Sequence, residues 1–146
     1  MSAHLRLELA AVDDTTDPLS LGRIKVKYVD GLISGWLQVA SPFAGTQSGM
    51  FSLPETDTPA LVAFATEDRT CGYIIGFLWT GTSKPPIAEN AQQKQVWLLK
   101  DGSGNSLKID ASANPNVISL ESTGDLLIKA AGKVTIKGDT IDMSKP

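Results

Sequence analysis

The last third of this 146-residue chain is repetitive. From residue 107 onward, pairs of apolar residues separated by one other residue recur at intervals of eleven, eight, eight and seven positions. The pairs are Leu107/Ile109, Ile118/Leu120, Leu126/Ile128, Val134/Ile136 and Ile141/Met143. Gly, Asn, Asp, Ser and Lys fill the segments between them, so each pair predicts a short strand followed by a tight turn. The pattern therefore predicts a solenoid with one strand per turn.

A ribbon of this kind is not expected to fold alone. Burying its ten apolar side chains contributes roughly 15–30 kcal/mol in gross, whereas ordering ~40 residues costs roughly 1–2 kcal/mol for each residue. Three identical chains around a shared axis would cover every pair and would supply hydrogen-bond partners for the strand edges. We therefore predict that residues 96–146 form one third of an intertwined trimeric β-helix, with the ten residues of the pairs in its core.

The preceding part of the chain predicts a small all-β domain. Short alternating segments, joined by loops that contain Gly and Pro, run from Leu21 to Phe77 without helical periodicity. Closure into a barrel would remove exposed strand edges. The alternating segment 5–9 could join this barrel or dock on another protein. The expected divisions are an N-terminal strand and linker (1–18), a barrel (19–82), a connector (83–95) and the β-helix (96–146).

The barrel segment carries a family resemblance. The ordered strings that carry it are Gly22-Arg23-Ile24-Lys25-Val26, Ser34-Gly35-Trp36-Leu37-Gln38-Val39-Ala40-Ser41, Phe43-Ala44-Gly45, Leu53-Pro54, Leu61-Val62-Ala63-Phe64 and Tyr73-Ile74-Ile75-Gly76-Phe77-Leu78. With the repeat behind them, they resemble the oligonucleotide/oligosaccharide-binding (OB) barrel of central spike proteins in contractile injection machines. That family includes the assembly protein V type baseplate spike of contractile phages and the VgrG proteins of type VI secretion.

The resemblance covers most of residues 20–146 and carries definite expectations. It implies an OB-fold barrel followed by a triple-stranded β-helix in a homotrimer that caps the tail tube and pierces the target envelope. Some relatives insert a lysozyme domain, and VgrG proteins carry a tube-hub region, but this chain has room for neither. A separate hub protein at the N-terminal end is therefore implied. The loop Pro54-Glu55-Thr56-Asp57-Thr58-Pro59 also departs from the Gly-Asp-Glu turn usual in the family.

The C-terminal end of the repeat predicts a further partner. A bare strand end is an association surface. Many phage spikes end in an iron-binding His-x-His apex, whereas the only histidine here is His4, near the opposite end. The chain thus resembles spikes that a separate PAAR-type cone completes. We expect one such tip protein per trimer, bound through Ile141, Met143, Lys145 and Pro146.

Catalytic and cofactor chemistry finds little support in the residues. The single histidine is far in sequence from the single cysteine, Cys71, whose apolar surroundings predict a buried structural residue. The acidic pairs Asp13-Asp14 and Glu67-Asp68 fall beside turn-like residues, where solvated carboxylates are more common than an acid/base pair. We therefore expect no enzymatic activity, no cofactor and no metal site.

Charge weighs against nucleic-acid binding. The net charge is -3, and the 13 Lys and Arg residues are scattered except at Arg23, Lys25 and Lys27. The leading expectation is a structural spike, and the alternative is a trimeric tail-fibre or adhesin fragment whose barrel binds a carbohydrate. The start does not resemble a signal peptide. We expect synthesis in the cytoplasm, a place on the tube axis at the baseplate, and only transient contact with the target membrane.

Overall fold

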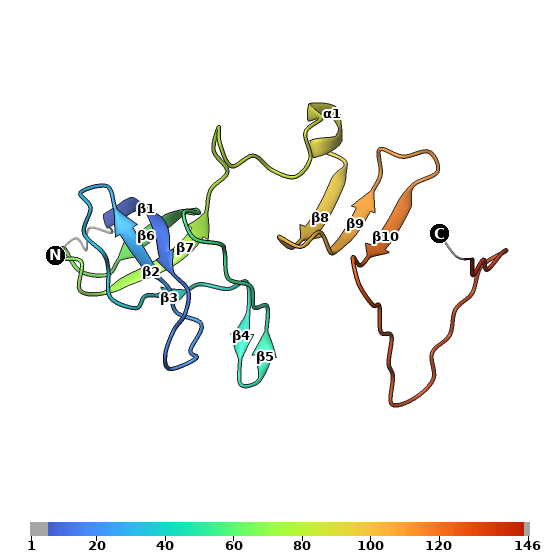
Figure 1. Cartoon of the computed structure of the whole chain (residues 1–146), viewed down its shortest axis with the longest axis horizontal. Coiled ribbons are helices and arrows are strands. Elements are labelled where there is room, and N and C mark those ends of the chain that lie inside the picture. Colours follow the sequence, from blue (N-terminus) through green and yellow to red (C-terminus); the bar gives the residue numbers. More distant parts are fainter. Residues whose placement is uncertain (1–5, 145–146) are drawn as a thin grey trace. The chain divides into compact units, whose positions relative to one another are not determined.

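The structure is a computed structural model that describes residues 6–144. The chain divides into two compact units, residues 1–85 and residues 86–146 (Figure 1). Strands and loops make up the described residues apart from one helical turn, α1 (Asn90–Gln93). No helix among them is long and apolar enough to span a membrane. The all-β class predicted from the sequence is confirmed, and the division between the units falls inside the expected connector.

A curled five-stranded sheet forms the first unit. Its strands and an accompanying hairpin are β1 (Arg6–Asp14), β2 (Lys25–Tyr28), β3 (Gln38–Val39), β4 (Ala44–Gly45), β5 (Ser48–Gly49), β6 (Pro59–Phe64) and β7 (Gly72–Phe77). The order in the sheet is β2-β1-β6-β7-β3, antiparallel except that β3 runs parallel to β7. A bridge between Ile24 and Leu37 connects the two ends of this order. The sheet thus curls into an OB-like half-barrel.

Strand β1 belongs to the barrel. It pairs with β2 on one side, where Ala10 faces Tyr28, and with β6 on the other, where Leu9 faces Leu61. Segment 5–9 was expected either to join the barrel or to dock on another protein. Its described residues 6–9 join the barrel. Alternation alone predicts a strand but does not identify its neighbours, which is why the sequence-based boundary at residue 19 leaves β1 outside the barrel.

The core of the first unit lies inside the curled sheet. The side chains of Ala10 and Val12 point inward from β1, whereas Leu7 and Leu9 on the same strand are exposed. The rings of Tyr28 and Phe64 lie with their centroids 6.1 Å apart. The largest fully buried side chains are those of Phe64, Ile24, Ile74, Val12, Val26 and Val62.

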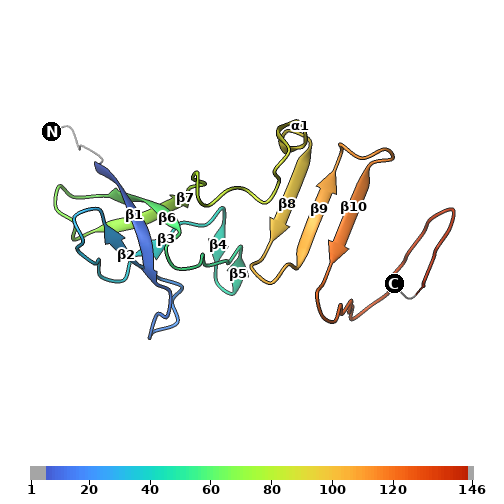
Figure 2. The ribbon, with the colours of Figure 1, turned by 45° about the horizontal axis from the view of Figure 1, so that its top comes forward.

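The second unit contains a three-stranded antiparallel sheet (Figure 2). Its strands are β8 (Val96–Lys100), β9 (Ser106–Asp110) and β10 (Val117–Glu121), in the order β10-β9-β8. Asp101 shapes the turn between β8 and β9, because its carboxylate accepts hydrogen bonds from the Asn105 backbone amide at 2.9 Å and from Asn105 Nδ2 at 2.7 Å. The first two predicted apolar pairs lie in β9 and β10.

The last three predicted pairs do not form strands in the single chain. Residues 122–144 contain no strand. All six side chains of these pairs are more than half exposed: Leu126, Ile128, Val134, Ile136, Ile141 and Met143. A lone ribbon has no neighbouring backbone to accept its hydrogen bonds and no second layer to cover its apolar side chains. The trimeric β-helix predicted from the repeat is therefore not observed in one chain.

Candidate functional site

The three-stranded sheet gathers large apolar side chains on one face. The register places Ile109 between Trp97 and Ile118. Residues directly opposite one another in an antiparallel sheet project to the same side. The resulting set consists of Trp97, Leu99, Leu107, Ile109, Ile118 and Leu120, and we call it the apolar sheet face. Each of these six side chains is exposed in the single chain.

The opposite face of the same sheet is better covered. Residues 86–89 and 92, which precede β8, line a cleft of about 310 Å³ together with residues of this face such as Leu98 and Lys108. Leu98, Lys108 and Ser119 are half-buried there, although two of them are polar. Burial in the second unit is therefore inverted: the face with lysine and serine is partly covered and the purely apolar face is bare. Water-exposed apolar area of this kind marks an interaction surface.

The structure brings together four of the ten predicted core residues. Leu107, Ile109, Ile118 and Leu120 lie on the apolar sheet face. The other six belong to residues 122–144, and no strand pairing joins them to that face. Trp97 and Leu99 complete the face but are missing from the core set predicted from the sequence. Their own one-residue separation, immediately before the repeat, is the signal that could have included them.

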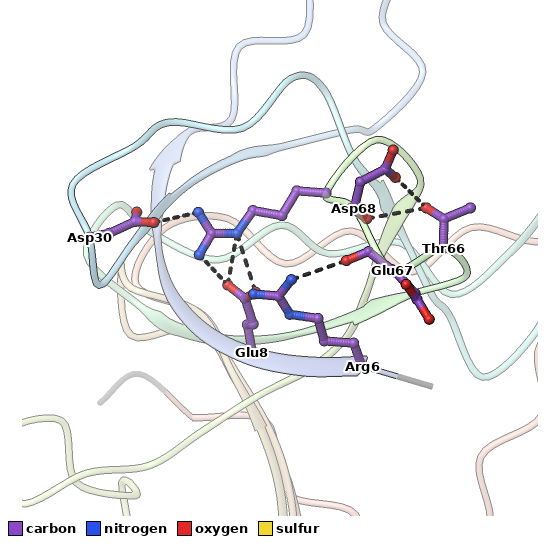
Figure 3. Close-up of polar contacts among 7 residues, drawn as sticks. Arg6, Glu8, Asp30, Thr66, Glu67 and Asp68 are labelled. Carbon is purple, nitrogen blue, oxygen red and sulfur yellow. Dashed lines mark hydrogen bonds and ion pairs between the residues drawn. The ribbon is translucent and has the colours of Figure 1, made fainter. Parts of the chain in front are cut away.

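The barrel carries a different kind of cluster at the end where β1 begins (Figure 3). Arg69 pairs with Glu8 at 2.7 Å and with Asp30 at 2.6 Å, and its guanidinium lies 4.2 Å from the centre of the Tyr28 ring. Arg6 also pairs with Glu8, and it donates a hydrogen bond of 3.1 Å to the carbonyl oxygen of Glu67. The loop before β7 is thereby connected to β1 and to the turn after β2.

The charges at this end of the barrel are paired with one another, as expected for groups that connect structural elements. The hydrogen bond from Arg69 holds the pKa of the Asp30 carboxyl below its ordinary value. The hydrogen bonds to Glu8 and Asp30 raise the pKa of Arg69. A general acid requires a carboxyl group whose pKa is raised instead. Among residues 6–144, no group of three or more His, Cys, Asp or Glu side chains could hold a metal ion. The half-buried Cys71 thiol lies 3.4 Å from Tyr73 Oη.

Comparison with known families applies to the barrel. Residues 8–79 match the family model of the type VI secretion system/phage-baseplate injector OB domain. The barrel is therefore similar to injector OB domains. The matched segment runs from β1 past the end of β7, just under half of the chain. It supports a baseplate-spike-related family and a place in a phage tail or injection particle, without distinguishing the VgrG type. No curated protein matches the chain in sequence.

The barrel is organised at its other end by Asp17. The Asp17 carboxylate accepts hydrogen bonds from the backbone amides of Leu19 and Leu21, both at 3.0 Å, and from Arg23 Nε at 2.9 Å and Nη2 at 2.7 Å. These bonds, that from Arg23 above all, hold the pKa of Asp17 well below its ordinary value. The loop between β1 and β2 is therefore fixed around one ionised side chain.

Replacing Asp17 by Asn should destabilise the barrel in a pH-dependent manner. Because folding lowers the pKa of Asp17, its ionised form stabilises the fold fully above the unfolded pKa of about 3.9, and this contribution is lost as the pH falls toward the folded pKa. Asp17→Asn should thus lower Tm at neutral pH, and the difference from the native chain should narrow below about pH 4. Thermal melts across this range measure the difference, and the control Asp13→Asn, at an exposed position, should change Tm little at neutral pH.

Proposed function

We propose that this chain is the structural central spike of a contractile injection machine and works as a homotrimer that caps the tail tube and pierces the target envelope. The similarity of the barrel to the injector OB domain supports a place at the baseplate. The observation that carries the proposal is the inverted burial of the β8–β10 sheet, in which six apolar side chains share one bare face. Three copies that turn this face to a common axis would bury it.

The remaining repeat extends the same arrangement toward the tip. Residues 122–144 present three more apolar pairs in an extended chain without strand partners. In a trimer, each pair would contact the equivalent pairs of two other chains, and the backbone groups would find partners in them. The intervening Lys, Asp, Ser and Thr side chains would face outward. Such a rod is stiff and has a polar surface that passes through an envelope without adhering.

The spike is proposed to act mechanically and without catalysis. In the described part of the barrel, the clustered carboxylates Glu8 and Asp30 are engaged by Arg69. The alternative function is a trimeric tail-fibre or adhesin fragment with a carbohydrate-binding barrel. The exposed aromatic residues Phe43, Phe51 and Tyr73 give it some support, since aromatic rings combine apolar faces with a large contact area.

Two measurements test the proposed function. Sedimentation equilibrium should give the mass of three chains at micromolar concentration, and a monomer would contradict the proposal. Electron microscopy of intact particles should place the protein on the tube axis, where a spike lies. Density at the periphery, together with binding of oligosaccharides to the purified protein, would instead establish the fibre or adhesin function.

Protein partners are proposed at both ends. A hub protein at the N-terminal end is supported by the exposed Leu7 and Leu9 on the outer side of β1. A PAAR-type tip protein at the other end is supported by Ile141 and Met143, the latter 93% exposed. Lys145 and Pro146, also predicted to bind the tip protein, lie outside the described residues.

Changing the two apolar tip residues should release the tip protein selectively. The double variant Ile141→Ser and Met143→Ser removes the apolar contact area at the end of the repeat, while the apolar sheet face stays intact. We expect loss of co-purification with the PAAR-type protein and an unchanged trimer mass. The matched control Thr140→Ser with Asp142→Ser alters the intervening positions and should retain the partner. Retention by the first variant would show that the tip protein binds elsewhere.

A further inference from the structure

The repeat leaves the three-stranded sheet beside the turn between β8 and β9 (Figure 2). The pairing of β9 with β10 ends where Ser106 faces Glu121, because the residues before Ser106 form that turn and offer β10 no further strand. The backbone carbonyl of Asn105 is already used on the β8 side, where it accepts a hydrogen bond of 3.1 Å from the Asp101 backbone amide. Strand pairing therefore does not hold the chain beyond Glu121.

The half-buried side chain of Asn105 holds it instead. Asn105 Oδ1 accepts hydrogen bonds from the Thr123 backbone amide at 2.9 Å and from Thr123 Oγ1 at 3.2 Å. Asn105 Nδ2 donates to Asp101 Oδ2 at 2.7 Å, and this bond lowers the pKa of Asp101, which favours its ionised form. We call Asp101, Asn105 and Thr123 the Asn105 relay. Because an amide has one donor end and one acceptor end, the Asp101 carboxylate determines which end faces Thr123.

Two further contacts fix the direction of the chain at this point. A Cβ atom added to Gly104 would lie 3.3 Å from Thr123 Cγ2, and the φ of Gly104 is +98°, so a larger residue in the turn would be strained and would crowd the Thr123 methyl group. Ser122 Oγ donates a hydrogen bond of 3.1 Å to the Asp125 carbonyl oxygen. The apolar pair at positions 126 and 128 follows directly, so the exit of the repeat is set by side chains of its first residues and of the turn.

We propose that the Asn105 relay is an alignment device, which fixes the direction in which the repeat leaves the sheet so that three chains present their repeats in the same orientation when the rod begins to form. This inference rests on the proposed trimer. Residues 122–144 have no strand partner within one chain, so their orientation at the sheet determines how often a chain is ready to pair with others. Asn105 is a positioning residue in this proposal, and Asp101 orients its amide.

Exchanging the two relay side chains in the full-length chain tests the alignment device. Asn105→Asp sets two carboxylates opposite one another, and Asp101→Asn turns a donor toward an N–H group of Asn105, so either change breaks the relay. The double variant Asp101→Asn with Asn105→Asp restores one amide and one carboxylate, and an acceptor again faces Thr123. Losing one hydrogen bond shifts a local equilibrium by about two- to tenfold, and three chains multiply the effect. After dilution from denaturant, each single variant should form trimer roughly tenfold more slowly or worse, and the double variant at nearly the native rate.

Hydrogen exchange of the Thr123 backbone amide reports the relay itself. It should be faster in both single variants than in the native chain and the double variant. The matched control is Asn90→Asp, which makes the same chemical change at an exposed position of α1. It should alter neither the exchange at Thr123 nor the rate of trimer formation.

The outcomes separate this inference from the proposed function. Single variants that form trimer at the native rate, or a double variant as slow as the single ones, overturn the alignment device and leave the spike intact. Faster exchange at Thr123 with unchanged assembly would show that the relay only holds the turn, and the alignment role would be wrong. A native chain that remains a monomer contradicts the proposed function and the alignment role together.

Discussion

Ile118→Asp should prevent the second unit from assembling. In one chain the Ile118 side chain is 74% exposed, so a carboxylate there would cost a monomer almost nothing. In the proposed trimer the same substitution places three carboxylates on the apolar sheet face, beside Ile109 and its copies, without a compensating cation. Uncompensated burial of a charge costs several kcal/mol for each ion. Sedimentation should show dissociation at micromolar concentration, and thermal melts should show a large fall in Tm.

The neighbouring residue provides a matched control. Val117 precedes Ile118 in β10, projects to the opposite face and is 44% exposed. Val117→Asp makes the same chemical change, and it faces Asp110, which adds some repulsion. It should nevertheless leave the trimer mass unchanged. If Val117→Asp were the more damaging of the two, as exposure in the single chain alone would suggest, the apolar sheet face would not be the contact between copies.

The sequence was most informative about the second unit where apolar residues are separated by one position. Leu107/Ile109 and Ile118/Leu120 lie in strands and share one face, as the two-residue period of a strand requires. The pattern predicted strands equally for residues 126–143, where one chain shows none. The two-residue period of apolar residues indicates which side chains can share one face. A strand also needs a neighbouring backbone as its hydrogen-bond partner. In the proposed trimer, another chain would supply this partner.

In the barrel, contacts between residues far apart in the sequence could not be predicted from the sequence. Arg69 and Glu8 are 61 positions apart, and nothing local to either residue indicates their pairing. The same holds for Phe51 against Gly22, although a glycine at positive φ is locally plausible within a turn. The alternating strand segments were recognisable because in and out positions follow the two-residue period. The Arg69 cluster and the contact between Phe51 and Gly22 depend on how those strands are ordered in the sheet.

Phe64→Ala should destabilise the barrel selectively. Phe64 is the largest fully buried side chain of the first unit, packed near the Tyr28 ring and against Gly72. Truncating a buried Phe costs about 3–5 kcal/mol, because transfer free energy is lost and a cavity remains. For a unit of this size, 1 kcal/mol corresponds to roughly 4–8 °C in Tm. The barrel transition should therefore fall by more than about 10 °C.

The second unit should survive this change, because its sheet shares no strand pairing with the barrel. Sedimentation of Phe64→Ala above the new barrel Tm should still give three chains, held by the apolar sheet face and the repeat. The matched control is Phe43→Ala, since that ring is 57% exposed in one chain and lies outside the barrel core. It should shift the barrel Tm far less. Dissociation of Phe64→Ala into monomers would show that the rod depends on folded barrels for its assembly.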